Sequence, residues 1–147
     1  MDTLTPDERR RNMRAIKSRN TKPELIVRRW LYEAGYRYRL NRKDLPGKPD
    51  ISMKGRRIAI FINGCFWHQH SGCRYAVIPA TRRAFWEAKL NSNKTRDGKI
   101  KQILIENGWR TLVIWECSLK SKENRERTQR EILDWLKTPS PYTEISG

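Results

Sequence analysis

Acidic side chains and long hydrophobic runs are both scarce in this chain. Its 147 residues include 16 Asp and Glu against 32 Lys and Arg, and the mean hydropathy is −0.88. The longest apolar stretch, from Ile58 to Ile62, has only the length of a β-strand, whereas a membrane-spanning helix needs about 20 apolar residues. The sequence shows no signal-peptide pattern. We therefore expect a cytosolic protein of one domain.

Cysteine is scarce as well. The chain has three cysteines, and an odd number argues against a closed disulfide framework. Two alternatives remain for these side chains, namely reduced thiols and metal ligands. Because free cysteine is a common residue of protein interiors, composition alone does not choose between them.

Positive charge is what the chain has in excess. The formal net charge is +16 and the pI is near 10.3. Such a surface favours polyanions, because each phosphate that a Lys or Arg neutralises releases counterions. A basic but otherwise ordinary soluble protein is the alternative. No Lys-rich helix with a clean apolar face is evident, so we expect nucleic acid rather than a membrane surface as the partner.

The pattern of apolar residues, caps and turns predicts an α/β domain with a mixed sheet flanked by helices. Residues 1–20 form a basic arm or helix with too few apolar groups to be buried, and we expect it to lie on a partner. The packed domain is expected over residues 21–138. Its predicted elements are a core helix from Thr21 to Gly35, strands at 36–40, 51–53, 58–62 and 111–115, a loop at 63–79, helices beginning at Thr81 and at Thr95 or Arg96, a last helix at 125–137, and a loose tail at 139–147.

The loop from Asn63 to Pro79 holds both histidines and two of the three cysteines. Cys65, His70 and Cys73 follow a C-x4-H-x2-C spacing, and Cys117 comes after the later TLVIW strand. Zinc prefers four such ligands in a tetrahedral structural site, and a metal would fix a loop that lacks regular hydrogen bonds. The alternative is a set of three buried free thiols.

His68 and the neighbouring aromatic side chains each allow two interpretations. His68 lies between the rings and the candidate ligands, so it is either a structural histidine or a group that is free for chemistry. Phe66, Trp67 and Trp86 either pack beneath the loop or form a wedge that enters a stack of bases. The strong positive charge of the chain makes the wedge a reasonable hypothesis.

Asp50 follows a Pro-Gly-Lys-Pro turn and precedes a short strand. A carboxylate at the edge of a strand suits Mg²⁺, which binds carboxylates, carbonyls and waters. Nuclease chemistry uses such an ion to activate water and to neutralise charge on the phosphate. The alternative is a simple structural role, since most Asp residues at such positions are turn formers.

Six segments span roughly residues 8–118 in order: NMRAIKSRNTKPE, LPGKPD, GCFWHQH, PATRRAFW, the N-x3-D of Asn93 and Asp97, and GWRTLVIWEC. Together they resemble the very short patch repair (Vsr) endonuclease family. The resemblance implies a restriction-endonuclease-like fold and a Mg²⁺-dependent enzyme that nicks DNA beside T:G mismatches, which arise when 5-methylcytosine deaminates. It also implies a monomer in the bacterial cytoplasm, at the nucleoid, with mismatch-repair proteins as candidate partners.

The same resemblance assigns roles to individual positions. Asp50 matches the Mg²⁺ ligand, together with the backbone carbonyl of Ile62, and His68 matches the catalytic histidine. The other matched positions are Glu24 and Asp97 as further acids of the catalytic site, Cys65, His70, Cys73 and Cys117 as structural zinc ligands, Phe66, Trp67 and Trp86 as the DNA wedge, and Met13, Arg14, Ile16 and Asn63 as DNA contacts.

The chain departs from the family pattern at two places. Asn63 stands where the best-known members have a second histidine, and an amide cannot act there as an acid or a cation. The HSGC segment is one residue longer than the usual form, and Gly72 would allow the extra turn. Two alternatives therefore stay open: a related nickase with relaxed or different mismatch and sequence specificity, and a zinc-stabilised DNA-binding protein without catalysis.

Overall fold

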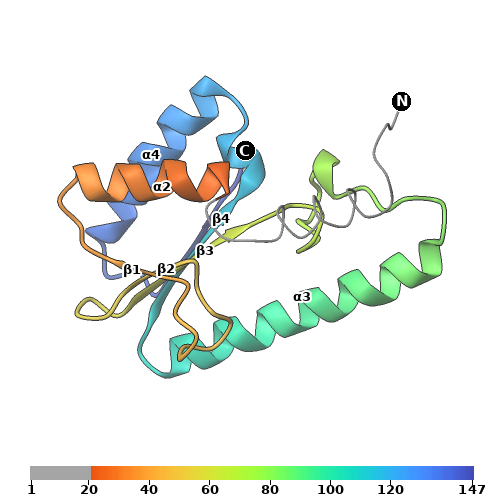
Figure 1. The fold of residues 1–147 in the computed structure, drawn as a ribbon, viewed down its shortest axis with the longest axis horizontal. Helices are drawn as coiled ribbons and strands as arrows, with labels where there is room; N and C mark the ends of the chain where they lie inside the picture. Colours follow the sequence, from red (N-terminus) through yellow and green to blue (C-terminus); the bar gives the residue numbers. More distant parts are fainter. Residues whose placement is uncertain (1–20) are drawn as a thin grey trace, which may run out of the picture.

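The computed structural model describes residues 21–147, and the predicted N-terminal arm with Met13, Arg14 and Ile16 lies outside the described residues. Five strands form one sheet in the order β1-β2-β3-β4-β5, and helices cover both of its faces (Figure 1). The predicted α/β class with a mixed sheet flanked by helices is confirmed. Within the described part of the chain, no helix combines the length and the apolar content needed to cross a membrane.

The sheet is mixed because its two halves are connected differently. The elements are α2 (Lys22–Glu33), β1 (Arg39–Leu40), β2 (Ile51–Met53), β3 (Ile58–Asn63), η1 (Arg74–Ala76), α3 (Arg83–Glu106), β4 (Arg110–Trp115), η2 (Glu116–Leu119), α4 (Lys122–Leu136) and β5 (Tyr142–Ile145). A loop over residues 41–50 joins β1 to β2, a short turn over residues 54–57 joins β2 to β3, and these three strands are antiparallel. Strands β3, β4 and β5 are parallel, so they need long crossovers, which α3 and α4 supply.

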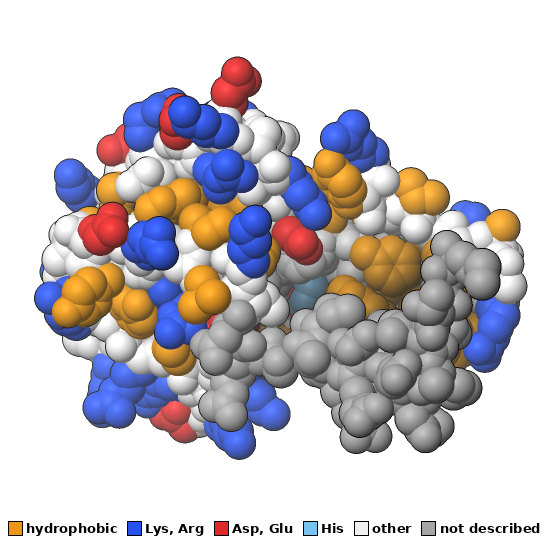
Figure 2. All heavy atoms as spheres, turned by 45° about the horizontal axis from the view of Figure 1, so that its top comes forward, with side chains coloured by type: hydrophobic (Ala, Val, Ile, Leu, Met, Phe, Trp, Pro, Cys, Tyr) orange, Lys and Arg blue, Asp and Glu red, His pale blue; other side chains and the backbone are white. Residues whose placement is uncertain are grey.

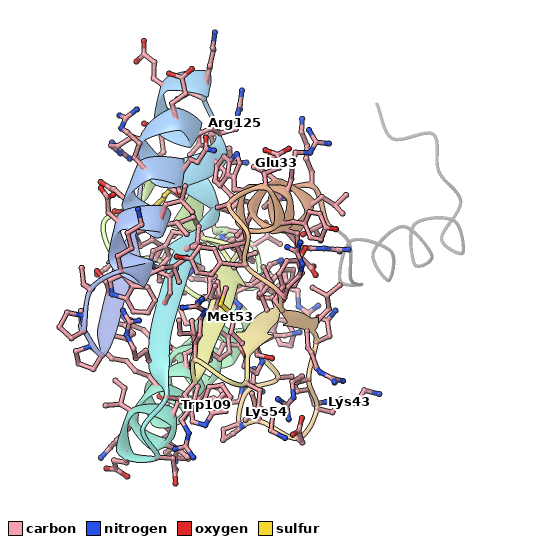
Figure 3. All side chains as sticks on the ribbon, turned by 90° about the vertical axis from the view of Figure 1, so that its left-hand side faces the viewer. Glu33, Lys43, Met53, Lys54, Trp109 and Arg125 are labelled. Atoms are coloured by element: carbon pink, nitrogen blue, oxygen red, sulfur yellow. The ribbon has the colours of Figure 1, made fainter. Side chains whose placement is uncertain are left out.

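Helices α2 and α4 lie side by side on one face of the sheet (Figures 1 and 3). The main core fills the space beneath them, where Leu31, Ile60 and Ile132 are completely buried. Burying one such side chain contributes about 1.5–3 kcal/mol. Met53 points into this layer, whereas Lys43 points away from the edge of the sheet (Figure 3). This packed layer fixes the beginning of β2 and the end of β3, where residues of the candidate site lie.

One continuous helix, α3, covers the other face of the sheet (Figure 1). The prediction of a second helix beginning at Thr95 or Arg96 is wrong. A threonine can cap a helix, but the residues around Thr95 include no proline and continue the helix without a break. Asn93 instead bonds outward, since its Nδ2 donates to the carbonyl oxygen of Trp67 at 3.1 Å. The long helix therefore links the loop after β3 to the sheet.

The C-terminal residues 139–147 were expected to be loose, and this prediction is also wrong. Strand β5 pairs in parallel with β4, and Ile145 is buried. Arg110 fixes the turn before β5, because its guanidinium donates to the carbonyl oxygens of Trp135 and Ser140. The packed domain consequently includes the last strand.

Smaller differences concern the ends of elements. Strand β1 has two residues where 36–40 was predicted, while β3 and β4 lie where buried strands were expected. Helix α4 begins earlier than predicted, at Lys122, because the Ser121 Oγ accepts the backbone N–H of Asn124 at 3.1 Å. The loop at 63–79 is irregular apart from the short turn η1.

Candidate active site and metal centre

Asp50 directly precedes β2, beside the central strand β3. Its Oδ2 accepts the backbone N–H of Ile62 at 2.7 Å, so the carboxylate is held against the end of β3. Burial raises the pKa of Asp50 to about 6, and the negative charge of Glu24 acts in the same direction. A buried carboxylate next to another acid is stabilised in its ionised form by a cation.

Glu24 reaches this corner from the first turn of α2 and is only 3% exposed. The guanidinium of Arg28, one helical turn later, lies 3.8 Å from its Oε1. The carboxylates of Glu24 and Asp50 form a pair of hard oxygen donors in one corner, since the negative charge of Glu24 raises the pKa of Asp50. This donor set fits Mg²⁺, which binds through one or two carboxylates and keeps several waters.

His68 and Asp97 come together from the loop after β3 and from the middle of α3. His68 Nδ1 lies 2.6 Å from Asp97 Oδ2. An ionised carboxylate can only accept, so this contact assigns a ring proton to Nδ1, and in the neutral imidazole Nε2 is then the acceptor. The two side chains are 31% and 33% exposed, so a substrate can reach them. The charge of His68 lowers the pKa of Asp50, which places the histidine in the same corner.

A cavity of about 360 Å³ opens beside this pair, between α3 and the sheet. Its lining includes His68, Asp97 and Asn63. Asn63 ends β3 and is 8% exposed, so its amide forms part of the cavity wall next to the histidine. In Figure 2 a histidine ring is visible in a hollow of the surface, with hydrophobic side chains beside it.

The three aromatic residues expected to form a wedge are in mutual contact. Ring centroids of Phe66 and Trp67 are 5.1 Å apart, and those of Phe66 and Trp86 are 5.6 Å apart. Phe85 extends the group at 5.4 Å from Trp86 and is 46% exposed. The cluster thus presents aromatic surface to solvent directly next to His68 in the chain, rather than being sealed in the core.

Cys65, His70, Cys73 and Cys117 also come together as the spacing predicted. Their candidate ligand atoms all lie within 4.8 Å of one another, and Cys117 Sγ is 3.5 Å from His70 Nδ1. Backbone turns shape the loop, since the N–H of His70 donates to the Cys65 carbonyl and the N–H of Cys73 to the His70 carbonyl. Gly72 has a φ of +71°, so the extra loop residue sits where glycine is favoured.

The chemistry of this Cys3His cluster fits zinc. Burial raises the pKa of Cys65 to about 12, and the neighbouring thiols of Cys117 and Cys73 act in the same direction. Thiols packed this closely stay neutral without a cation, whereas Zn²⁺ binds them as thiolates. Four protein ligands complete a tetrahedral shell, so a zinc ion here would have a structural role.

Trp115, which contacts the cluster, and Glu144, which bonds to Trp115, are absent from the predicted site. The indole of Trp115 stacks on the His70 ring with centroids 4.1 Å apart and planes at 8°, and its Nε1 donates to Glu144 Oε1 at 2.7 Å. The position of Trp115 two residues before Cys117 is a local signal that could have indicated it. Glu144 has no such signal, because it reaches the site only through the pairing of β5 with β4.

The sequence of this chain is similar to those of known proteins. The family model described as DNA mismatch endonuclease Vsr matches residues 1–74. The type II nicking enzyme V.XorIIP of Xanthomonas oryzae pv. oryzae is 45% identical over 133 residues, which cover 90% of this chain and 97% of that protein. The chain belongs to the Vsr family of DNA mismatch endonucleases.

Two further Vsr relatives support this assignment over most of the chain. The type II nicking enzyme V.NmeAIP of Neisseria meningitidis is 42% identical over 137 residues, covering 90% of this chain and 97% of that protein. DNA mismatch endonuclease Vsr of Escherichia coli is 38% identical over 130 residues, covering 87% and 83%. The Vsr resemblance and the restriction-endonuclease-like fold predicted from the motifs are therefore confirmed, and the family is one of nucleases.

Proposed function

We propose that this protein is a DNA endonuclease that nicks one strand beside a T:G mismatch and so initiates repair of deaminated 5-methylcytosine. The observation that carries the proposal is the 2.6 Å contact between His68 Nδ1 and Asp97 Oδ2, in the same corner as the buried carboxylate of Asp50. The relatives, a DNA mismatch endonuclease and a nicking enzyme, support the same class of reaction.

Asp50 and the backbone carbonyl of Ile62 would hold Mg²⁺, and Glu24 would hold waters around it. When bound, the ion would supply positive charge against the scissile phosphate and its attacking water. Asp50 is suited to this role because burial and Glu24 disfavour its lone negative charge. A divalent cation would relieve both effects, whereas a neutral side chain at residue 50 would gain nothing from it.

His68 would act as the general base for the attacking water. Asp97 accepts the hydrogen bond from Nδ1–H and so fixes the ring orientation, which leaves Nε2 of the neutral imidazole to take a proton from water. As the water oxygen bonds to phosphorus, the bond from phosphorus to the departing sugar oxygen breaks, that oxygen takes a proton from solvent water, and one strand is cut. The imidazolium that forms would be stabilised by the adjacent carboxylate of Asp97.

Binding of DNA would combine charge with ring stacking. The net charge of +16 favours a polyanion, and the rings of Phe66, Trp67 and Trp86 would enter the duplex next to the mismatch. Stacking of a base on an aromatic ring contributes about 1–3 kcal/mol. The N-terminal residues that resemble DNA contacts, Met13, Arg14 and Ile16, would touch the same duplex. A monomer acting at the bacterial nucleoid, together with mismatch-repair proteins, fits this function.

Asn63 favours a second candidate, a related nickase with different mismatch or sequence specificity. Its amide lines the cavity beside His68 and Asp97, at the position where the best-known members have a titratable histidine. An amide can donate to a phosphate oxygen, but it cannot carry a charge near neutral pH. Two relatives at 42–45% identity are type II nicking enzymes, which is consistent with a nickase.

Cleavage of a library of end-labelled duplexes tests both candidates. The library would carry one T:G pair in varied flanks, matched C:G duplexes would serve as controls, and each reaction would run with Mg²⁺ and with EDTA. We expect one nick, in one strand, only with Mg²⁺ and only beside the mismatch. Equal nicking of C:G duplexes would favour the relaxed nickase. Binding without cleavage in any duplex would leave only a zinc-stabilised DNA-binding protein.

A further inference from the structure

Strand β5 is linked to the Cys3His cluster through the side chain of Trp115. Glu144 of β5 accepts the Nε1–H of Trp115 at 2.7 Å, and the same indole lies flat against His70 at 4.1 Å between centroids. The orientation of the indole about its side-chain bonds decides where its flat face lies. The hydrogen bond from Trp115 to Glu144 therefore helps to set the orientation of the indole, and the indole in turn packs against the imidazole of His70.

The chain reaches the cluster a second time at Gly147. Its backbone N–H donates to Cys117 Sγ at 3.3 Å. A Cβ added at Gly147 would lie 2.6 Å from the carbonyl oxygen of Cys117, which is closer than real Cβ contacts. The approach that permits this hydrogen bond therefore depends on the absence of a side chain at residue 147. An N–H that points at sulfur stabilises the thiolate more than the thiol.

We propose that Glu144 and the Gly147 amide are positioning groups for a zinc ion bound by Cys65, His70, Cys73 and Cys117. This inference rests on the proposed structural zinc site. Glu144 holds the Trp115 indole so that it locks the His70 ring in its ligating orientation, and the Gly147 amide stabilises the Cys117 thiolate. Outer contacts of this kind typically change metal affinity by about 10–100-fold when they are removed.

A purely architectural role of β5 makes a different prediction. Ile145 is the residue of β5 that packs into the core, with 4% of its surface exposed, whereas Glu144 is exposed. Removal of the Glu144 carboxylate should therefore leave the packing of β5 and the thermal unfolding of the metal-free protein nearly unchanged. A loss of zinc affinity with unchanged metal-free unfolding would separate positioning from packing.

Competition with a chromogenic zinc chelator measures the effect on the full chain. We expect Glu144→Ala to weaken zinc binding about 10–100-fold, and Glu144→Gln to stay within about threefold of the parent, because its amide oxygen still accepts from Trp115. Glu131→Ala is the matched control, because it removes an exposed acid from α4, and it should bind zinc like the parent.

A double-mutant cycle tests whether Glu144 acts through the indole. Trp115→Phe keeps a ring but loses the N–H donor, so Glu144→Ala should have little further effect in that background. If Glu144→Ala weakened zinc binding in the Trp115→Phe background as much as in the parent, Glu144 would not act through the indole of Trp115. Zinc binding by Glu144→Ala that equals the parent would overturn the role of Glu144. A parent that binds no zinc would instead overturn the proposed zinc site itself.

The amide of Gly147 has its own test. Gly147→Ala places a Cβ against Cys117 and should displace the N–H from sulfur, so we expect zinc release to the chelator to become about tenfold faster. Ser146→Ala is the matched control, because it keeps the backbone carbonyl that Arg127 binds and adds no atom near the cluster. Equal release rates for Gly147→Ala and the parent would remove this amide from the proposal.

Discussion

The two histidines of the loop after β3 are separated by one residue and have unlike surroundings. His68 faces Asp97, is about one-third exposed, and lies at the wall of a cavity. His70 lies flat on Trp115 and beside Cys117 Sγ, and burial lowers its pKa. A histidine with a carboxylate on Nδ1 and an open second nitrogen is equipped for proton transfer. One held by a ring and a thiol is equipped to bind a metal.

The comparison shows how one short loop serves two sites. The carbonyl of Phe66 accepts the Nε2–H of Gln69 at 2.7 Å, which tightens the turn between the two histidines. A metal on the His70 side would fix the turn from one end, and α3 fixes it from the other through Asp97. The position of His68 therefore depends on the metal site at His70 and on the contact with Asp97 of α3. Substitutions in the catalytic corner and in the Cys3His cluster should affect different properties of the protein.

The largest expected effect belongs to the catalytic side. Asp50→Asn should abolish detectable nicking of a T:G duplex while leaving duplex affinity within about threefold, since it removes a metal ligand and little of the positive surface. Single-turnover cleavage and a gel-shift titration measure the two quantities. Nicking by Asp50→Asn at the parent rate would exclude Asp50 from the reaction.

The next largest effect is expected at the Cys3His cluster, in the variant Cys117→Ser. Cys117→Ser should release about one zinc ion per chain and lower the thermal midpoint, because the loop then lacks its clamp. Metal analysis by mass spectrometry and a thermal melt measure these changes. Cys117→Ser should also slow nicking, but only indirectly, so the remaining activity should fall in step with the folded fraction. Full zinc retention in this variant would show that Cys117 is no ligand.

A smaller change is expected at the aromatic cluster. Trp67→Ala should lower the preference for a T:G duplex over a paired duplex by about tenfold, since a stacking ring contributes about 1–3 kcal/mol. Binding to paired DNA should change little. Trp109→Ala is the control, because Trp109 follows the C-terminal end of α3, whereas the loop after β3 leads into the N-terminal end of that helix (Figure 1). Equal discrimination by Trp67→Ala and the parent would assign Trp67 to packing.

The last expected effect is on stability. Burial raises the pKa of Asp50 from 3.8 to about 6, so the ionised carboxylate destabilises the fold above pH 6, and this penalty disappears below the unfolded pKa. Without Mg²⁺, Asp50→Asn should therefore be more stable than the parent at pH 7, by on the order of 2 kcal/mol, and about equal to it near pH 3.5.

Urea unfolding at the two pH values measures this difference. Asp44→Asn is the control with the opposite sign, because the hydrogen bond from Arg42 lowers the pKa of Asp44. Removal of that carboxylate should not stabilise the protein at pH 7. A parent and an Asp50→Asn protein of equal stability at pH 7 would mean that the carboxylate is not penalised by its surroundings.

Local sequence signals were sufficient where a single segment determines the outcome. Turn chemistry and alternation place Asp50 before a buried strand, and the few thiols and imidazoles limit the possible ligands so strongly that Cys117 could be joined to the loop. The corner of Asp50, Glu24, His68 and Asp97 came from the resemblance to a family, since nothing local links α2 with α3.

Long-range pairing is where sequence reasoning failed. The tail contains two prolines and only a short alternating stretch, so its strand forms because β4 offers a free edge and Ile145 a core position. Glu144 is near the cluster only as a result of that pairing. The predicted break in α3 failed for a related reason. Thr95 can cap a helix, but packing of the helix against the sheet and loop favours continuation.

The most direct test of the central claim compares His68→Ala with His70→Ala in the same assay. Single-turnover nicking of a T:G duplex and the zinc content would be measured on each preparation. His68→Ala should keep its zinc and nick about 10²–10⁴-fold more slowly than the parent, whereas His70→Ala should lose zinc. A His68→Ala protein that retains zinc and nicks at the parent rate would contradict the account.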